Sequence, residues 1–134
     1  MTFFVNCSPP RSLSKNSKRV YNGHVVENPK AKGAKADIVS LFQKYAPNTP
    51  YLGPVRLVLT FFYPYPAQTA KKVLSSGGRP MVKTPDVDGI ASGVMDCMTT
   101  LRFWLDDKQV YCLHVEKWEV PDNCGIRVEI EEKI

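Results

Sequence analysis

Apolar residues at helical spacing, held between two groups of aspartates, place the strongest constraint on how this chain folds. Between residues 87 and 101 the apolar side chains recur at steps of three and four, which predicts an amphipathic helix over residues 87–100. They are Val87, Ile90, Ala91, Val94, Met95, Met98 and Leu101. Pro85 ends the segment before it, so Asp86 stands at the N-cap position and Asp88 in the first turn. Two carboxylates are therefore expected at one helix start.

A second pair of carboxylates, Asp106 and Asp107, follows the same helix. A helix of about 14 residues is on the order of 20 Å long, so this pair reaches Asp86 and Asp88 only if the chain doubles back. The apolar pattern from Val110 onward predicts a strand that permits this return. Taken singly, such aspartates are typical of a helix cap, a partner of the helix dipole and a turn. Taken together they repel one another, and a cation normally relieves such a cluster.

The residue types around these carboxylates indicate which cation they would bind. The segment Asp86-Val87-Asp88 opens like an EF-hand loop, but Ala91 stands where that loop needs its glycine and Cys97 where it needs its last glutamate. The EF-hand interpretation therefore fails. Oxygen ligands without a nearby His or Cys ligand favour Mg²⁺ or Mn²⁺ over zinc.

The remaining apolar patterns and turn residues predict five further elements. They are a strand over residues 2–6, a helix over 34–45, a strand over 55–63, a strand from 110 and a strand over 126–131. The run over 55–63 is apolar on both faces, which is typical of a central strand. This order predicts a single domain over residues 1–134, of the α/β class (α+β type), with a mixed sheet and helices packed on it.

The strand after the second acidic pair alternates between apolar and polar residues. Tyr111, Leu113 and Val115 are expected to face inward. His114 falls on the other face and is left out of the chemistry. The turn over residues 121–125 predicts a hairpin, so the last strand is expected to return beside this one.

Charge divides the chain into two unequal halves. Residues 1–85 hold thirteen Lys or Arg against two acids, whereas residues 86–134 hold five against eleven, and the whole chain carries +5. A basic surface can hold a polyanion while carboxylates hold cations that act on it, which is the arrangement of a metal-dependent nuclease. The alternative is a solvated surface with a chance asymmetry, and the seven basic residues against one acid between Arg11 and Lys35 favour binding.

Two basic segments are the candidates for contact with DNA. The segment over residues 64–83 contains no acid and a Gly77-Gly78 hinge, and it leads straight into Pro85-Asp86. A loop of this length is usually functional or disordered, so it is interpreted as a mobile clamp that delivers the phosphate backbone to the carboxylates. The candidate DNA-binding residues are Arg11, Lys15, Lys18, Arg19, Lys71, Lys72, Arg79 and Lys83.

Several separate stretches together resemble the RusA family of Holliday-junction resolvases. They are Pro85-Asp86-Val87-Asp88, the helix that contains Asp96, and the run Phe103-Trp104-Leu105-Asp106-Asp107-Lys108-Gln109-Val110. The family pattern is Asp-x-Asp-Asn, a helix, Asp-Asp-x-Gln-Val and a strand that carries a Lys, and the gap from Asp88 to Asp107 matches without insertion. The resemblance covers residues 80–120.

The resemblance also assigns roles to individual residues. It implies that Asp86, Asp88 and Asp107 are the metal-binding, catalytic carboxylates and that Lys117 is the catalytic lysine of the strand. Because the family pattern singles out the second Asp of its pair, Asp106 is expected to support the metal ligands or to form the turn.

The function that this resemblance implies is resolution of Holliday junctions by paired, symmetric nicks, in DNA recombination and repair. Mg²⁺ is the expected cofactor, Mn²⁺ is expected to substitute for it, and no small-molecule cofactor is expected. The partner is a four-way DNA junction, and its two-fold symmetry implies a homodimer with one active site in each chain. The expected products carry a 5′ phosphate and a 3′ hydroxyl.

Two alternatives remain open. One is a metal-dependent nuclease that acts on other branched or flapped DNA. The other is a junction-binding protein with impaired chemistry, because Gly89 stands where the family usually has Asn and Ser92 where it usually has Lys. A lysine at that position would share a helix face with Asp88, and Lys83, Lys108 or Lys117 would have to supply its charge.

Cysteine use and hydropathy bear on the compartment. The four cysteines form no CxxC pair and no zinc-ligand spacing, so free thiols in a reducing compartment are expected. No apolar run approaches the about 20 residues of a membrane span, and no secretory leader is recognisable at the amino terminus. The chain is therefore expected in the cytoplasm of a bacterial or phage-infected cell, with no membrane partner.

Overall fold

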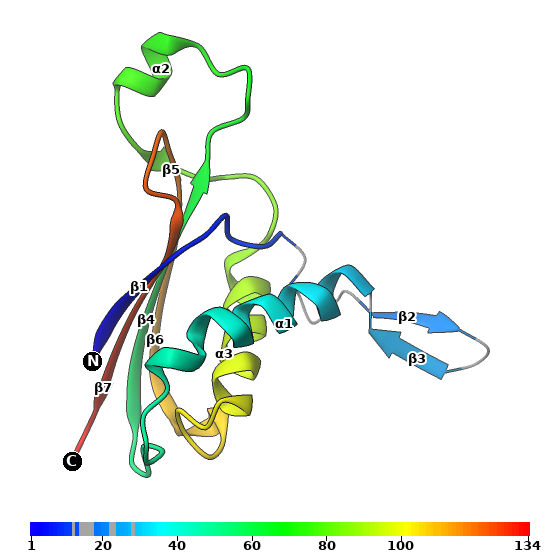
Figure 1. The fold of residues 1–134 in the computed structure, drawn as a ribbon, viewed down its shortest axis with the longest axis vertical. Coiled ribbons are helices and arrows are strands. Elements are labelled where there is room, and N and C mark those ends of the chain that lie inside the picture. Colours follow the sequence, from blue (N-terminus) through cyan, green and yellow to red (C-terminus); the bar gives the residue numbers. More distant parts are fainter. Residues whose placement is uncertain (12, 14–17, 22–23, 28) are drawn as a thin grey trace.

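The computed structural model describes residues 1–11, 13, 18–21, 24–27 and 29–134. Of the described residues between 18 and 31 it describes the backbone and not the side chains. Figure 1 shows its elements along the chain. They are β1 (Thr2–Asn6), β2 (Lys18–Tyr21), β3 (His24–Glu27), α1 (Pro29–Phe42), the 3-10 helix η1 (Gln43–Tyr45), β4 (Val55–Pro64), α2 (Lys71–Ser75), β5 (Arg79–Pro80), α3 (Val87–Thr100), the 3-10 helix η2 (Asp107–Gln109), β6 (Val110–Val120) and β7 (Gly125–Glu132).

A mixed sheet of five strands forms the centre of the fold, in the order β1-β7-β4-β6-β5. The strand β4 pairs in parallel with β6 and antiparallel with β7, while β1 and β5 pair antiparallel at the two ends of the sheet. The strands β2 and β3 form a separate antiparallel pair. The predicted class, a mixed sheet with helices packed on it in an α+β fold, is confirmed.

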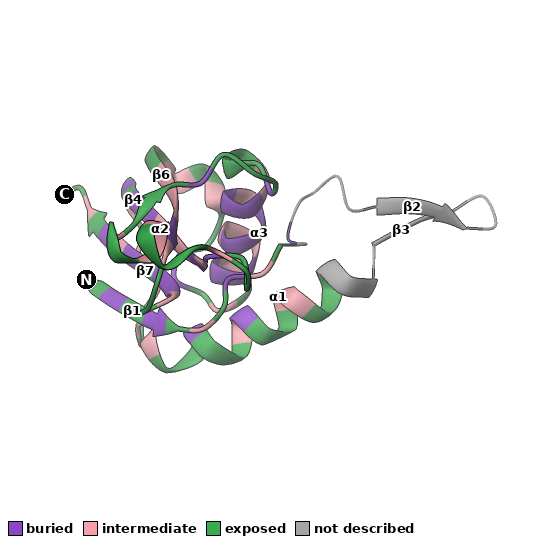
Figure 2. Ribbon diagram, turned by 90° about the horizontal axis from the view of Figure 1, so that it is seen from above, coloured by how far each residue is buried: buried purple, intermediate pink, exposed green. Residues whose placement is uncertain are grey.

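The main core lies between this sheet and the two long helices. Both α1 and α3 cover the same face of the sheet, as Figure 2 shows from above. On that face Phe3 of β1 meets Phe42 of α1 edge to face, with ring centroids 5.3 Å apart. The central position of β4 is also confirmed, and it follows from side chains that are apolar on both faces of the strand. Within the described residues no helix is long and apolar enough to cross a membrane.

Three expectations about the elements need correction. The first helix runs over Pro29–Phe42 and ends in the 3-10 turn η1, earlier at both ends than the predicted span. The segment over residues 64–83 is not an irregular loop throughout, because it contains α2 and β5. The strands β6 and β7 do not form a hairpin ladder, since β4 lies between them. An apolar strand is best buried at the sheet centre, so the turn at 121–124 crosses over the end of β4.

The prediction that Tyr111 and Leu113 face inward is only half right. Leu113 pairs with Leu57 and Lys117 with Phe61, so the odd-numbered side chains of β6 do lie on the face that carries the helices. Nevertheless 54% of Tyr111 and 45% of Leu113 remain exposed, whereas Val115 is half-buried. Nothing in the described chain covers the outer part of β6 at these two residues.

Candidate active site

The two carboxylates at the start of α3 are confirmed at their predicted positions. Asp86 is the N-cap residue of α3, with extended backbone (φ −72°, ψ 147°), and Asp88 lies in the first turn. The Asp86 carboxylate makes no capping hydrogen bond to the helix, and both residues are exposed. Helix capping therefore does not account for Asp86. The positive end of a helix dipole attracts negative charge, so this helix start is a favourable place for anionic groups.

Lys117 of β6 lies at the same end of α3. Its Nζ donates hydrogen bonds to the carbonyl oxygens of Lys83 (2.6 Å) and Pro85 (2.7 Å). Pro85 directly precedes Asp86 in the chain, so the ammonium group is fixed beside the start of the helix. The strand lysine and the first two aspartates thus come from separate elements and meet in one place.

Arg11 reaches the same place from the N-terminal segment. Its Nη1 donates to the carbonyl oxygen of Thr84 at 3.3 Å, and its guanidinium lies 5.1 Å from the ring centroid of Tyr63. The Tyr63 hydroxyl in turn donates to the carbonyl oxygen of Pro10 at 3.0 Å, and burial raises the pKa of this hydroxyl. One of the predicted DNA-binding residues therefore belongs to the same cluster as the carboxylates.

A glycine in α3 allows the segment that carries Arg11 to pass close to the helix. A Cβ on Gly93 would come within 2.6 Å of the Leu13 Cβ and closer still to the Leu13 carbonyl oxygen. Leu13 itself is fully buried. Only glycine permits this approach, and the sequence analysis did not identify its role.

The second acidic pair lies at the other end of α3. The Asp106 carboxylate accepts a hydrogen bond from the Lys108 N–H at 2.9 Å and caps η2, while the Gln109 side chain accepts from the Asp106 N–H at 3.2 Å. The Lys108 N–H holds the pKa of Asp106 below its ordinary value. Asp106 is thus the turn residue that was expected, and Asp107 follows it as the first residue of η2.

One chain does not bring Asp107 to Asp86 and Asp88. The helix between them has 14 residues and is therefore about 20 Å long. The strand β6 starts beside Asp107 and reaches the Asp86 end only at Lys117, after about seven residues at roughly 3.3 Å each. In the described residues no three His, Cys, Asp or Glu side chains converge as metal ligands. The expectation that Asp107 meets Asp86 and Asp88 within one chain is therefore wrong. The strand β6 begins after Asp107, so it brings later residues, and not Asp107, back along α3. The three aspartates remain predicted metal ligands.

The basic arm over residues 71–83 is fixed at its base by a carboxylate that sequence reasoning missed. Glu119 of β6 is only 3% exposed and accepts from Arg79 Nε at 3.1 Å and from Lys83 Nζ at 3.4 Å. The Arg79 guanidinium also lies 4.9 Å from the ring centroid of Tyr65, whose hydroxyl donates to the Gly77 carbonyl oxygen at 2.6 Å. The signal in the sequence was an acid at an inward position of the strand.

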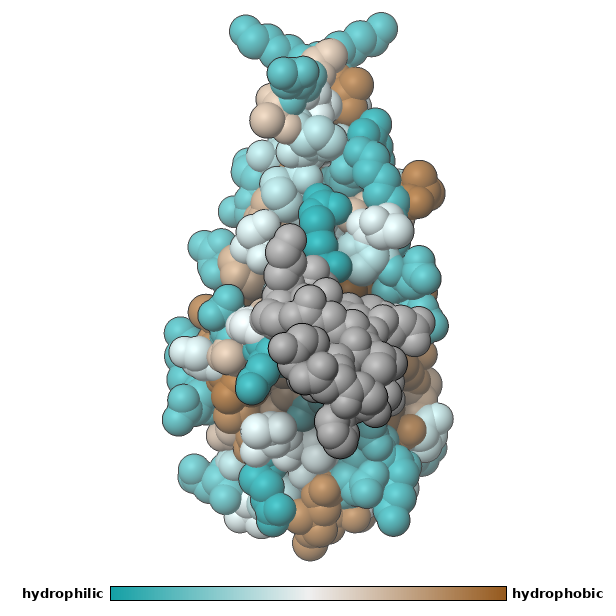
Figure 3. Space-filling model, turned by 90° about the vertical axis from the view of Figure 1, so that its right-hand side faces the viewer, coloured by the Kyte–Doolittle hydropathy of each residue, from teal (hydrophilic) through white to brown (hydrophobic). Residues whose placement is uncertain are grey.

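The structure describes the remaining predicted DNA-binding residues to different extents. Lys71 and Lys72 are exposed on α2. Figure 1 shows α2 at one end of the long axis of the molecule, and in Figure 3 the surface at this end is largely hydrophilic. Lys18 and Arg19 lie in β2, but their side chains are not described, and Lys15 lies outside the described residues.

The two departures from the family pattern lie on α3. Ser92 Oγ is buried and no described residue forms a hydrogen bond with it, so this position presents no cation to Asp88. Gly89 is half-buried in the first turn. Lys117 and Arg11 are the described cations held at this helix end.

Comparison with known proteins identifies the family. The model of the family Endodeoxyribonuclease RusA matches residues 8–131, which contain both acidic pairs, Lys117 and Arg11. No curated protein matches the chain. Since the match covers nearly the whole chain, and the helix start, the strand lysine and the second acidic pair lie within it, the chain belongs to the RusA family of endodeoxyribonucleases.

Proposed function

We propose that this protein resolves four-way DNA junctions by paired, symmetric nicks, as a Mg²⁺-dependent homodimer. The observation that carries the proposal is the meeting of Asp86, Asp88, Lys117 and Arg11 at one helix start, in a member of an endodeoxyribonuclease family. Metal-dependent hydrolysis of a phosphodiester uses carboxylates to hold the cation and basic groups to hold the phosphate.

The donor set at this place fits magnesium only in part. Mg²⁺ is commonly bound by one or two carboxylates together with water and substrate phosphate, and Asp86 and Asp88 offer two. The third expected ligand, Asp107, lies at the other end of α3 within the same chain. When bound, magnesium would neutralise phosphate charge and lower the pKa of a bound water.

Lys117 and Arg11 have the geometry of phosphate-binding groups. An ammonium carries three N–H donors, and Lys117 uses two of them on the Lys83 and Pro85 carbonyl oxygens, which leaves one for a phosphate oxygen. The Arg11 guanidinium uses one donor on Thr84 and keeps others for the same purpose. Both groups are pre-ordered by backbone carbonyls, so little side-chain entropy is lost when DNA binds.

The basic arm supports binding of a polyanion beyond this centre. Lys71 and Lys72 on α2 carry exposed charge away from the sheet, while Glu119 holds Arg79 and Lys83 at the base of the arm. Such charges contribute to binding through release of counterions from DNA, so affinity should fall steeply with salt.

Replacement of Asp88 by Asn tests the proposal. Cleavage of a synthetic four-way junction with Mg²⁺ should fall to background, while binding should be unchanged or tighter because a charge that repels DNA has been removed. The control is Asp122→Asn, which changes an exposed aspartate in the β6–β7 turn and should leave cleavage unchanged. Retained cleavage with lost binding in Asp88→Asn would contradict the role of Asp88.

Junction specificity requires a separate comparison of substrates. The unmodified protein should cleave the four-way junction in preference to a flap and to a plain duplex, and only when Mg²⁺ or Mn²⁺ is present. Equal cleavage of the flap would favour a nuclease for other branched DNA.

A junction-binding protein without chemistry is the second candidate, and a specific observation favours it. A buried Ser92 Oγ stands where the family usually places a lysine, so this position presents no cation to Asp88. This candidate predicts tight binding of the junction and no product even with Mn²⁺.

A further inference from the structure

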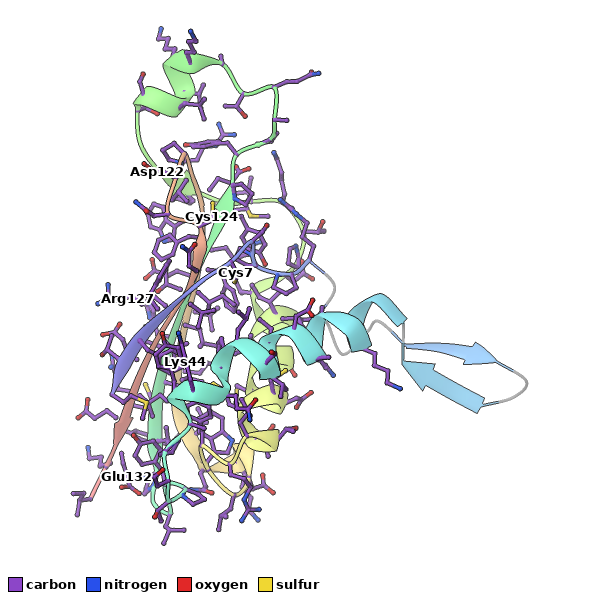
Figure 4. The ribbon with its side chains drawn as sticks, viewed as in Figure 1. Cys7, Lys44, Asp122, Cys124, Arg127 and Glu132 are labelled. Atoms are coloured by element: carbon purple, nitrogen blue, oxygen red, sulfur yellow. The ribbon has the colours of Figure 1, made fainter. Side chains whose placement is uncertain are left out.

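Two cysteines that are far apart in the sequence meet at one end of the β1–β7 ladder. The pairing of these strands ends with Asn6 opposite Gly125. Cys7 follows Asn6 and Cys124 precedes Gly125, so one further step of the antiparallel register places the two cysteines opposite each other. Figure 4 shows both labelled side chains at this end of the sheet.

Both side chains belong to the face of the sheet that the helices cover. Val5 and Ile126 are paired in the ladder and buried on that face. Side chains alternate along a strand, so Cys7 and Cys124, each two residues further on, share the same face. Opposed residues of an antiparallel pair have Cα atoms about 4.5–5.5 Å apart, and a disulfide spans Cα separations of about 4.4–6.8 Å. The backbone is therefore spaced for a disulfide at this pair.

The charge of one thiol is affected by the other. Burial, and after it the neighbouring Cys124, raises the pKa of the Cys7 thiol. Burial, and after it the charge of Asp122, raises the pKa of Cys124. Both cysteines are reduced thiols in this structure. A thiolate is disfavoured at this place, whereas a disulfide carries no charge, so burial does not oppose the bond.

The Cys7 side chain has room to turn toward its neighbour. Together with Pro10 and Ile38 it lines a cavity of about 330 Å³ beside α1. A change of rotamer at Cys7 therefore displaces no packed side chain from this cavity.

The other two cysteines lie elsewhere in the fold. Cys97 is buried in α3, and its Sγ donates to the Lys35 carbonyl oxygen at 3.5 Å. Cys112 lies on β6, which β4 separates from β7. Among the four thiols, only Cys7 and Cys124 occupy opposed positions of neighbouring strands.

The segment that follows Cys7 leads directly to the start of α3. The Pro10 carbonyl oxygen accepts from the Tyr63 hydroxyl at 3.0 Å, and Arg11 donates to the Thr84 carbonyl oxygen at 3.3 Å. A bond at Cys7 would therefore fasten the base of the segment that places the Arg11 guanidinium.

We infer that Cys7 and Cys124 are a redox modification site: they form a reversible disulfide by exchange with a low-molecular-weight disulfide such as glutathione disulfide, and this bond holds the segment that carries Arg11 against β7. Cys124 follows the turn after β6, the strand of Lys117. The bond thus joins the two parts of the chain whose cations are ordered beside Asp86. Neither the bond nor its effect on the segment depends on the proposed function.

The exchange needs no reactant besides glutathione disulfide. The thiolate of one cysteine attacks a sulfur of glutathione disulfide, and one glutathione leaves as its thiolate. The second cysteine loses its proton and attacks the protein sulfur of this mixed disulfide, which releases the second glutathione. Two protein thiols are oxidised, one glutathione disulfide is reduced to two glutathione thiols, and the two protons pass to these products. Exchange should become faster as the pH rises, because the thiolate fraction increases.

Equilibration of the full chain with glutathione buffers tests the bond. After an acid quench, peptide mass spectrometry should find Cys7 linked to Cys124 in the unmodified protein and equally in Cys112→Ser, the matched control. Cys7→Ser should instead carry glutathione on Cys124. The equilibrium constant of the Cys7–Cys124 bond should fall on the order of 100-fold in denaturant, because the folded register no longer holds the thiols together. A folded protein that yields only mixed disulfides, or equal constants in the folded and denatured states, overturns the inference.

Hydrogen exchange and thermal unfolding test what the bond holds. Oxidation of the unmodified protein and of Cys112→Ser should raise the melting temperature by about 10 °C, because the bond closes a loop that spans most of the chain. It should also slow exchange at the amides of Cys7, Ser8 and Arg11. Cys7→Ser should show neither change.

A bond that forms without slowing exchange at these amides would overturn its role in holding the segment. None of the measurements contains DNA, so they distinguish failure of this inference from failure of the proposed function.

Discussion

The two ends of α3 carry the same kind of residue and use it differently. At the start of the helix Asp86 stands at the cap position but makes no capping hydrogen bond, and Lys117 and Arg11 are held beside it. At the other end the Asp106 carboxylate accepts a hydrogen bond from the Lys108 N–H, as part of a complete capping box. A carboxylate that no described residue holds in a capping hydrogen bond, while cations are ordered beside it, is available for a ligand, whereas a satisfied cap stabilises the fold.

Asp86 and Asp106 both precede a helix, so only their contacts in the folded chain distinguish their roles. An Asp before a helix is most often a cap, and that interpretation holds for Asp106 but fails for Asp86. What separates them is their neighbours. Segments distant in sequence, β6 and the N-terminal segment, supply cations to one end, whereas Gln109, three residues from Asp106, supplies the reciprocal cap at the other. Four substitutions would break or sharpen the comparison.

The largest effect is expected from Lys117→Met at the start of α3. Loss of the ammonium removes a fixed positive group from the proposed phosphate site, so cleavage of a junction under Mg²⁺ should fall by on the order of 100- to 1,000-fold. Lys133→Met, a change at an exposed lysine after β7, is the control and should cleave normally. Near-normal cleavage by Lys117→Met would remove the distinction between the two helix ends.

Glu119→Gln should loosen the basic arm that leads to the same helix end. Glu119 is buried and holds two half-exposed cations, so loss of its charge should lower the free energy of unfolding by about 1–3 kcal/mol. Denaturant unfolding measures this change, and faster proteolysis within residues 71–83 is expected with it. Glu131→Gln, at an exposed position of β7, should change neither. An arm that is no more sensitive to protease in Glu119→Gln would contradict its role as an anchor.

Gly93→Ala tests whether the close passage of the N-terminal segment supports the helix start. The new Cβ would collide with the Leu13 backbone and displace the segment that carries Arg11. Overpacking of this kind should cost about 1–3 kcal/mol of stability. Gly33→Ala is the matched control, because a Cβ at Gly33 in α1 meets nothing within 4 Å and should stabilise the helix by up to about 1 kcal/mol. Thermal unfolding should therefore show a lower melting temperature for Gly93→Ala and a higher one for Gly33→Ala than for the unmodified protein.

The smallest effect is expected from Asp106→Ala at the other end of α3. The pKa of Asp106 is lowered in the folded state, so its ionised form stabilises the protein above the pKa of the unfolded chain, and this contribution is lost as pH falls through the folded pKa. The melting temperature of Asp106→Ala should therefore lie slightly below that of the unmodified protein at neutral pH. The difference should begin to shrink as the pH falls through about 3.9, the ordinary pKa of aspartate, and should vanish below the lowered pKa of folded Asp106. A difference that persists at low pH would mean that the charge of Asp106 is not what stabilises the turn.

Local patterns predicted the elements that lie next to the site. The helix over residues 87–100 was placed correctly at both ends, because a proline and an aspartate mark its start and its apolar spacing is regular. The central strand was recognised from apolar side chains on both faces. Local patterns failed for β6 and β7, where the short turn suggested a hairpin although β4 occupies the place between them. Pairing partners depend on which strand buries the most apolar surface, which no single segment records.

The sequence by itself determined the residue types of the site, the helix that presents two of its carboxylates and the family to which the chain belongs. Only the tertiary structure decided which groups meet. It brought Lys117 and Arg11 to Asp86, bound Arg79 and Lys83 to Glu119, and left Asp107 at the far end of α3. The physical reason is that a helix fixes distances along its own axis, whereas contacts between distant segments follow from how the sheet and helices share one core.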